Sequence, residues 1–301
     1  MSILSIESLS VRYRGAAAVS VKDVSCEINL GEVVALTGEN GAGKSTLIHT
    51  LNGSLKPSNG HVFMHGSDIV SRPSIARRLT ATMRQSNTPI RGMTPRQAVV
   101  NAALLRGMPL KESRHRADSL FKALNMEDQA EKPGESLSGG IRRLTNLAVT
   151  LVQDTPIVLL DEPTNDVDPS RRSLLWKLLA SLAGQNKLVL VTTHNISEAS
   201  HYTNRQLIMI KGRIVYDGSV SNIPDNAPWS LIDVPSDTLL PESLEKLVVA
   251  KNSECLTLSI PQDGEGLASL LDRLRDVAPN VTVRRSRSFE SLFEEYRKKE
   301  Q

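Results

Sequence analysis

Residues 38–46 read GENGAGKST, and they follow the apolar run VVALT at residues 33–37. The residues after the glycines have the spacing of a helix, which we expect over 43–52. A buried strand, a glycine-rich turn and a helix in this order match the G-x-x-x-x-G-K-[ST] pattern of phosphate-binding loops, in which free backbone N–H groups converge on phosphate and a lysine adds a cation. The sequence therefore predicts a nucleotide site formed by Gly38, Glu39, Asn40, Gly41, Ala42, Gly43, Lys44, Ser45 and Thr46.

A pair of carboxylates supplies further groups that a nucleotide with Mg²⁺ requires. The run IVLLDEP at residues 157–163 reads as an apolar strand that carries Asp161 to its carboxyl end, and Glu162 follows. Asp161 and the Ser45 hydroxyl are suited to Mg²⁺, and Glu162 is suited to activating water. An acidic pair before Pro163 could also simply begin a turn. The phosphate loop favours the catalytic interpretation.

Two isolated polar residues lie at the ends of other short runs. Gln85, in TMRQSN, falls where a strand gives way to a loop, and its amide could reach the metal or the water. His194 ends LVLVTTH and could donate to a γ phosphate. A lone glutamine or histidine is more often ordinary surface or core. Their order along the chain is what makes them candidates.

A second glycine-rich segment, SLSGGIR at residues 136–142, precedes an apolar and basic helical stretch. Ser138, Gly139 and Gly140 would leave the first N–H groups of that helix unhindered, which suits an anion. A plain glycine-rich cap is the alternative. The phosphate for this segment, if it binds one, has to come from elsewhere.

The pattern of apolar runs predicts two domains. Over residues 1–217, strands that are apolar at consecutive positions alternate with helical stretches, as in a parallel α/β sheet buried on both faces. A helical subdomain is expected as an insertion at about 86–150, and its basic exterior is typical of a solvated face rather than a binding patch. After a linker-like stretch at 219–230, residues 218–301 predict a small α+β domain of strand, helix, strand and helix.

Charge, cysteine content and the length of the apolar runs indicate the partners and the cellular compartment to expect for this chain. The net charge is +3, from 36 basic and 33 acidic residues, which is too balanced to argue for nucleic acid as a partner. Cys26 and Cys255 form no disulfide framework or zinc motif, which favours a reducing cytosol. We find neither the pattern of a signal peptide nor an apolar run long enough to span a membrane. Any membrane role would depend on another chain.

Taken in order, these motifs resemble those of the ATP-binding cassette (ABC) ATPases over about residues 3–217. The matching features are the aromatic Tyr13, the phosphate loop at 38–46, Gln85, the LSGG signature at 137–140, LLDEP at 159–163, the D-loop NDVDP at 165–169 and His194. The resemblance implies a P-loop NTPase core with a mainly parallel sheet, an N-terminal antiparallel β subdomain and the inserted helical subdomain, followed by the small C-terminal domain. It also implies that two cassettes pack head to tail, so that the signature Ser138, Gly139 and Gly140 of one chain face the γ phosphate of ATP on the other.

The resemblance also implies roles for single residues. Tyr13 would stack on adenine, although it is flanked by arginines and could equally be an exposed strand aromatic. Ser45 and Gln85 would meet Mg²⁺ and Asp161 would support its outer shell. Lys44 would hold phosphate, Glu162 would polarise water and His194 would stabilise the transferring phosphoryl group.

Two positions depart from the family's usual pattern. Ile141 stands where the signature normally continues with glutamine, which would remove a polar contact near the partner's nucleotide. The D-loop carries Asn165-Asp166-Val167-Asp168 in place of the commoner Gly-Leu-Asp type ending. Neither change removes a group essential to hydrolysis.

The expected function is that of a cytosolic motor subunit, peripheral to the cell membrane, which powers a separate transmembrane permease. It would work as a homodimer or paired with a second cassette. The ending RSFESLFEEYRK at residues 287–298 resembles the tail of drug and polysaccharide exporter cassettes of the daunorubicin-resistance type, which favours export over import. The alternatives are a soluble cassette that remodels nucleic acid or ribosomes and a regulator without turnover. The single cassette disfavours the first, and the intact Glu162 and His194 disfavour the second.

Overall fold

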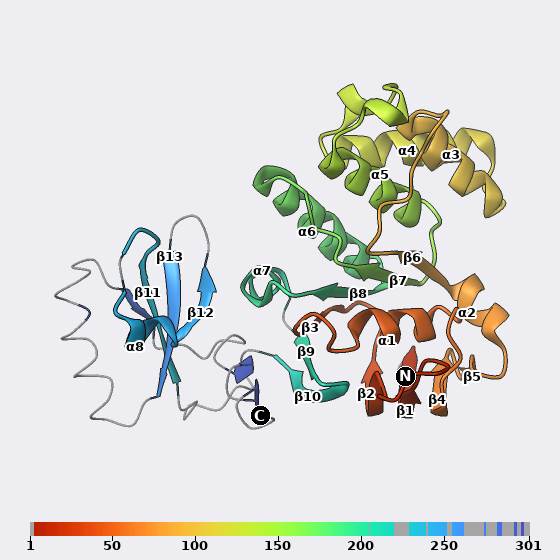
Figure 1. Ribbon diagram of the computed structural model, residues 1–301. Helices are drawn as coiled ribbons and strands as arrows, with labels where there is room; N and C mark the ends of the chain where they lie inside the picture. The colour runs from red at the N-terminus through yellow and green to blue at the C-terminus, as the bar shows by residue number, and fades with distance from the viewer. Residues whose placement is uncertain are drawn as a thin grey trace. The chain divides into compact units, whose positions relative to one another are not determined.

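The computed structural model describes residues 3–203, 205–219, 229–238, 240–251, 255–261, 274, 282–284, 292–293 and 296–297. The chain divides into two compact units, Met1–Asp217 and Gly218–Gln301 (Figure 1). In the part of the chain that the structure describes, no helix is both long and apolar enough to cross a bilayer.

The first unit is built on a six-stranded sheet whose central strands are parallel. In spatial order its strands are β10 (Arg213–Gly218), β9 (Arg205–Ile210), β3 (Val33–Thr37), β8 (Leu188–Thr193), β7 (Ile157–Asp161) and β6 (Thr80–Met83). Thr37 pairs with Thr193, and Asp161 pairs with Thr192. The carboxyl ends of β3, β7 and β8 therefore meet at one edge, the usual ligand edge of such sheets.

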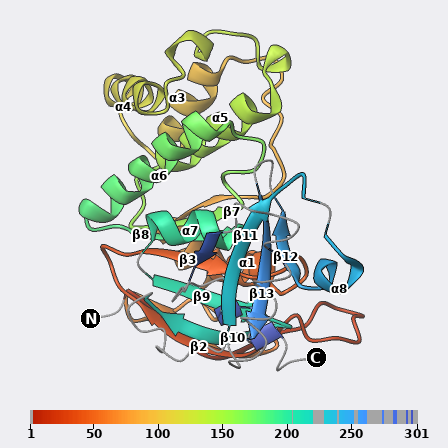
Figure 2. The ribbon, with the colours of Figure 1, turned by 90° about the vertical axis from the view of Figure 1, so that its left-hand side faces the viewer.

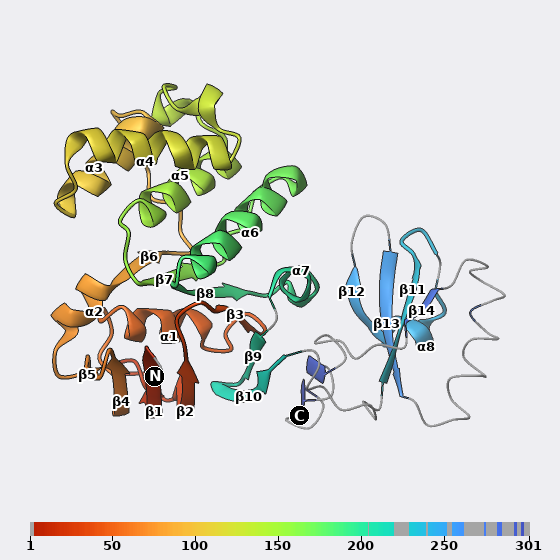
Figure 3. The same ribbon diagram turned by 180° about the vertical axis from the view of Figure 1, so that it is seen from behind.

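Both faces of this sheet are covered, which explains the uninterrupted apolar runs of the sequence. Side chains of β7 and β8 alternate between two cores: Val158 and Val189 face the core that contains α6 (Pro169–Gly184), and Ile157 and Leu188 face the core that contains α1 (Lys44–Leu51). Figures 1 and 3 show α1 and α6 on opposite faces of the sheet.

A smaller antiparallel sheet lies beyond α1. Its strands, in spatial order, are β2 (Val21–Ile28), β1 (Leu4–Val11), β4 (Asn59–Met64) and β5 (Ser67–Asp68). Leu47 and Ile48 of α1 share one core with this sheet and with β3. Burial of each such side chain contributes roughly 1.5–3 kcal/mol, so the two sheets hold α1 firmly from both sides. The predicted N-terminal antiparallel sheet and mainly parallel core are confirmed.

The stretch between β6 and β7 forms the predicted helical insertion. Its main helices are α3 (Pro95–Leu105), α4 (Leu110–Ala123) and α5 (Gly139–Leu151), which Figure 2 shows on the α6 side of the sheet. The start of α3 is fixed by a capping box between Thr94 and Gln97, with Pro95 at the first helical position. The remaining elements of the first unit are α2 (Pro73–Leu79), the short 3₁₀ turns η1 (Glu127–Gln129) and η2 (Gly134–Ser136), and α7 (Ile196–Tyr202).

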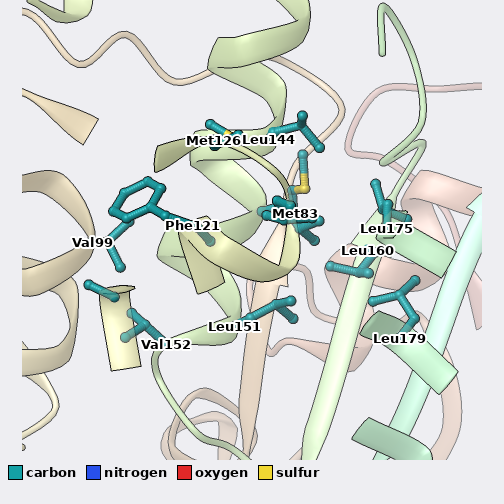
Figure 4. Packing of buried hydrophobic residues seen from close by; sticks show 14 of the residues in the cluster. Met83, Val99, Phe121, Met126, Leu144, Leu151, Val152, Leu160, Leu175 and Leu179 are labelled. Carbon is teal, nitrogen blue, oxygen red and sulfur yellow. The ribbon is translucent and has the colours of Figure 1, made fainter. Parts of the chain in front are cut away.

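One apolar cluster joins these helices to the sheet. Phe121 of α4 and Leu144 of α5 lie in the same cluster as Met83 of β6, Leu160 of β7 and Leu175 of α6 (Figure 4). Met83 is two residues before Gln85, and Leu160 directly precedes Asp161. The helical insertion is thus packed directly against the strands that carry two candidate site residues.

The second unit contains an antiparallel sheet and a short helix. The sheet order is β12 (Val248–Lys251), β13 (Cys255–Pro261), β11 (Trp229–Pro235) and β14 (Thr282–Arg284), and α8 spans Glu242–Glu245. The expectation that Trp229 and Ser230 belong to a linker was wrong, because they begin β11 and pair with Pro261 and Ile260.

Most of the helix expected in GLASLLDRLRDVAP lies outside the described residues, as does most of the exporter-like tail at 287–298. The described core of the unit consists of the buried residues Ile232, Val234, Leu244, Leu256, Leu258 and Leu274.

Candidate nucleotide site

A cavity of about 390 Å³ lies where β3 ends. It is lined by Ser20, Asn40, Gly41, Gly43, Lys44, Ser45, Thr46, Gln85 and Glu162. Residues from four parts of the chain thus meet in one place. The strand order brings three of these parts together, because the loops after β3, β6 and β7 all leave the sheet at the same edge; the fourth part is Ser20, which precedes β2.

The loop 38–46 needs glycine at two positions for steric reasons. Gly38 has φ +154°, and a Cβ there would lie 2.2 Å from the carbonyl oxygen of Met209. Gly43 has φ +108°, and its Cβ would lie 2.4 Å from the carbonyl oxygen of Ser20. No side chain fits such distances, so the loop can pack against its neighbours only with glycine. Helix α1 begins directly afterwards, at Lys44.

Lys44 is a buried cation inside this loop, with a relative exposure of 6%. Its Nζ donates hydrogen bonds to the carbonyl oxygens of Gly38 (2.7 Å) and Glu39 (3.0 Å), and it lies 4.0 Å from Oε1 of Glu162. Burial lowers the pKa of Lys44 below its usual value, and the nearby carboxylates only partly oppose this shift. The loop therefore holds a buried positive charge at the wall of the cavity, which favours an added anion.

Asp161 ends β7 and Glu162 follows it, and both residues are almost fully buried. The hydroxyl of Thr192 donates to Oδ1 of Asp161, and the backbone N–H of Glu162 donates to the hydroxyl and carbonyl oxygens of Thr192, each at 3.1 Å. Glu162 has a left-handed backbone, with φ 52°. Such a conformation costs a non-glycine residue about 1–3 kcal/mol, and it turns the side chain toward the cavity and His194.

His194 follows β8 and contacts the neighbouring strand end. Its Nδ1 lies 2.9 Å from Oε2 of Glu162, and 54% of its side chain is exposed. The histidine is thus fixed at its inner edge by a buried carboxylate and open at its outer edge. This arrangement suits a group that meets a ligand arriving from outside.

Tyr13 lies beside the loop, from the segment after β1. Its hydroxyl is 3.2 Å from Oγ1 of Thr46, and 42% of the residue is exposed. A ring in this position is available for stacking.

The signature residues lie elsewhere in the unit. Ser138 is the N-cap of α5, and its hydroxyl accepts a hydrogen bond of 3.4 Å from the backbone N–H of Ile141. A Cβ on Gly140 would lie 2.4 Å from the carbonyl oxygen of Asp166, so this glycine allows the signature to pack against the D-loop. Ser138, Gly139 and Gly140 are not among the residues that line the cavity.

The two departures from the family pattern have structural consequences. Ile141 is 8% exposed and packs in the apolar cluster of the helical insertion, so its side chain points into the core. In the D-loop, Val167 is buried and Asp168 is the N-cap of α6, accepting a hydrogen bond of 3.0 Å from the N–H of Arg171. A hydrogen bond from Ser170 helps to lower the pKa of Asp168 to about 2.

Sequence reasoning missed three residues that the structure places at or beside the cavity. Ser20 lines it, Thr192 anchors both acidic residues, and Arg143 reaches the backbone of the loops that carry Gln85 and Glu162. Thr192 could have been found from the sequence, because it is a hydroxyl residue two positions before His194, near the end of the apolar run that forms β8. Ser20 and Arg143 carry no local signal.

These features, a phosphate cradle beside two strand-end carboxylates, define a P-loop nucleoside triphosphatase. The sequence profile of the family described as ABC transporter matches residues 21–165. The Nod factor export ATP-binding protein I of Burkholderia orbicola is 32% identical over 233 residues, which cover 77% of this chain and 74% of that protein. The chain belongs to the ABC transporter family of ATP-binding proteins.

Other relatives and solved structures agree with this assignment. The doxorubicin resistance ATP-binding protein DrrA of Mycobacterium tuberculosis is 28% identical over 278 residues, which cover 88% of this chain and 83% of that protein. ATP-binding cassette sub-family A member 7 of Rattus norvegicus is 33% identical over 221 residues, which cover 73% of this chain but only 10% of that longer protein.

Among solved structures, cbiO1 of Clostridium perfringens, described as part of the ABC transporter complex cbiONQ, has a TM-score of 0.64 and 30% identity over 72% of this chain and 88% of that chain. The dimeric cassette MJ0796, described as bound to ADP and Pi in a post-hydrolysis state, has the same fold. Its TM-score is 0.66 at 24% identity, over 72% of this chain and 98% of that chain.

Proposed function

We propose that this chain is the ATP-binding and ATP-hydrolysing subunit of an exporter, and that ATP-driven dimerisation of the cassette powers a separate permease. The observation that carries the proposal is the division of the family's motifs between two places. Lys44, Gln85 and Glu162 share one cavity, whereas the signature residues do not line it. Two composite sites would therefore form in a dimer. Each chain would supply its cavity to one of these sites and its signature residues to the other.

In the proposed hydrolysis, each group acts from its observed position. The backbone of 38–46 and Lys44 hold the phosphates, and Tyr13 stacks on the adenine ring. Glu162 accepts a proton from the attacking water, for which its buried carboxylate at the cavity wall is well placed. His194 steadies Glu162 and donates to the transferring phosphoryl group from its exposed edge.

Mg²⁺ fits the oxygen donors of the site. Within the described residues, no group of three or more His, Cys, Asp or Glu side chains is arranged to hold a metal ion. A metal bound here would therefore take most of its ligands from phosphates and water, as Mg²⁺ does with nucleotides. Ser45 and Gln85 would contact it and Asp161 would support its outer shell. When bound, Mg²⁺ would neutralise charge on the phosphates.

The signature would act on the partner's nucleotide. Ser138, Gly139 and Gly140 begin α5, and a helix N-terminus with small residues favours an anion. ATP would then bridge two cassettes, and hydrolysis would release them. The partner is a second copy of this chain or another cassette. A related fold is described as a dimer with ADP and Pi, which supports this arrangement.

Export is the favoured direction of transport. Two relatives bear names of export or drug resistance, and one solved relative is described as part of a transporter complex. We place the chain at the cytoplasmic face of the membrane, held there by its permease. Remodelling of nucleic acid or ribosomes has no comparable support.

The proposal is tested by inspecting the neighbouring reading frames for a multi-span membrane protein and expressing the tagged chain together with it. The chain should then co-purify with that protein from detergent-solubilised membranes and hydrolyse ATP in the complex. A chain that stays out of the membrane fraction and elutes with ribosomes or nucleic acid would overturn the transport assignment.

A further inference from the structure

Arg143 is a charged residue in the core of the first unit. It lies on α5, five residues after the N-cap Ser138, and only 1% of it is exposed. Within the described part of the chain, no carboxylate comes within ion-pair distance of its guanidinium. Its charge is met instead mainly by backbone carbonyl oxygens, with one longer contact of 3.5 Å to Oδ1 of Asn87. This arrangement needs an explanation because burial of an unpaired ion is costly.

The carbonyl oxygens belong to the two loops that carry candidate site residues. Nη1 of Arg143 donates to the carbonyl oxygens of Arg84 (2.9 Å) and Gln85 (2.6 Å). Nη2 donates to those of Asp161 and Glu162, at 2.6 Å for the latter. One planar side chain therefore bridges the loop after β6 and the carboxyl end of β7.

The geometry requires an arginine. Nη1 and Nη2 lie on the same rigid fork, so the two pairs of carbonyl oxygens are held at a fixed separation. A lysine keeps the positive charge but concentrates its donors on one nitrogen, which cannot bridge both pairs in the same way. What Arg143 fixes is the position of the Gln85 peptide relative to the Glu162 peptide.

We propose that Arg143 is a positioning residue, which sets the Gln85 and Glu162 side chains relative to each other and ties that pair to the helix that begins with the signature. The proposal rests on the proposed ATP hydrolysis. In each chain, the side chain of Arg143 would link the residues that line the cavity to the signature residues at the N-terminus of α5.

A change at Arg143 should affect turnover rather than nucleotide binding. The hydrogen bonds of Arg143 go to the loops after β6 and β7 and not to Lys44 or the loop 38–46, so the affinity for ATP should be retained. A misplacement of catalytic groups by about 1 Å can cost about 100-fold in rate. In Arg143→Lys we expect kcat to fall by about 10- to 100-fold, with KM for ATP within about twofold of the wild type.

Arg106 offers a matched control. It follows α3 and also donates to two carbonyl oxygens, that of Arg77 in α2 (3.0 Å) and that of Thr80 (2.9 Å), where β6 begins at the opposite end of that strand from Gln85. Arg106→Lys removes the same kind of contact between the helical insertion and the sheet. It should leave both kcat and KM unchanged, even if the melting temperature falls.

The experiment measures steady-state ATP hydrolysis, ATP affinity and melting temperature for the wild type, Arg143→Lys, Arg143→Gln and Arg106→Lys. A folded Arg143→Lys with low kcat and normal ATP affinity supports the positioning role, and a folded Arg143→Gln should be at least as slow. If Arg143→Gln fails to fold, Arg143→Lys alone decides. Normal turnover in Arg143→Lys, a defect confined to KM, or an equal loss in Arg106→Lys would overturn the inference. An inactive wild type would instead contradict the proposed hydrolysis.

Discussion

Nδ1 of His194 lies 2.9 Å from Oε2 of Glu162, although the two residues are 32 positions apart in the chain. The contact exists because β7 and β8 are parallel neighbours and both residues sit just beyond the strands' carboxyl ends. The left-handed backbone of Glu162 completes it. A strained acidic residue held against a half-exposed histidine is the arrangement expected at a site of proton transfer.

Replacing Glu162 with Gln should slow ATP turnover by about 10²- to 10⁴-fold, the usual contribution of a general base, while ATP still binds.

Because His194 contacts Glu162 directly, the effect of removing the imidazole on turnover should overlap with the effect of removing the Glu162 carboxylate. His194→Ala should slow turnover by about 10²-fold or more, but the double variant should be slowed by less than the product of the two effects.

The matched control for this pair is Glu32→Gln. Glu32 precedes β3 at the opposite edge of the sheet, where it pairs with Arg205, and its loss should leave turnover unchanged. Hydrolysis close to normal in Glu162→Gln would show that another group acts as the base.

Replacing Lys44 with Ala should weaken ATP binding, because it removes charge-assisted hydrogen bonds worth about 1.5–3 kcal/mol, which is about 10- to 150-fold in the dissociation constant. Lys187→Ala is a suitable control, since Lys187 pairs with Asp154 and does not line the cavity. Equilibrium titration with a fluorescent ATP analogue measures both. An unchanged dissociation constant in Lys44→Ala would contradict the phosphate role.

Replacing Ser138 with Arg should abolish ATP-driven dimerisation while leaving ATP binding to the single chain intact, because the added side chain would obstruct the N-terminus of α5, which we propose faces the partner's γ phosphate. Size-exclusion chromatography with ATP, in a Glu162→Gln background, measures the effect. Ser138 is also an N-cap, whose loss alone costs about 0.5–2 kcal/mol of stability. Thr94→Ala, which removes the cap of α3, controls for that loss and should still dimerise. Dimers of Ser138→Arg would refute the composite site.

Replacing Tyr13 distinguishes stacking from a passive surface position. Stacking contributes about 0.5–1.5 kcal/mol, so Tyr13→Ala should weaken ATP binding by about two- to tenfold. Tyr13→Phe keeps the ring and loses only the hydroxyl contact with Thr46, and should bind ATP normally. Equal affinity in all three proteins would mean that the ring is simply exposed.

Local pattern was sufficient for much of the fold and for the phosphate loop. The strand, the glycine turn and the helix at 33–52 depend on neighbouring residues, so spacing alone predicted them. Buried strands were recognisable because both their faces are covered. The strand β11 was missed, because its backbone groups are satisfied by pairing with β13, some 25 residues away. The residues of β11 and their neighbours in the sequence do not indicate that partner.

By itself, the sequence determined the order of the motifs and the chemical type of each site residue. Only the tertiary structure decided which of them meet: the strand order places Lys44, Gln85 and Glu162 around one cavity, sets His194 against Glu162 and leaves Ser138 outside it. It also decided that Ile141 points into the core and that Arg143 reaches the backbone of two loops. The physical reason is that helix and turn formation depend on adjacent residues, whereas contacts between strand ends depend on how distant segments pair.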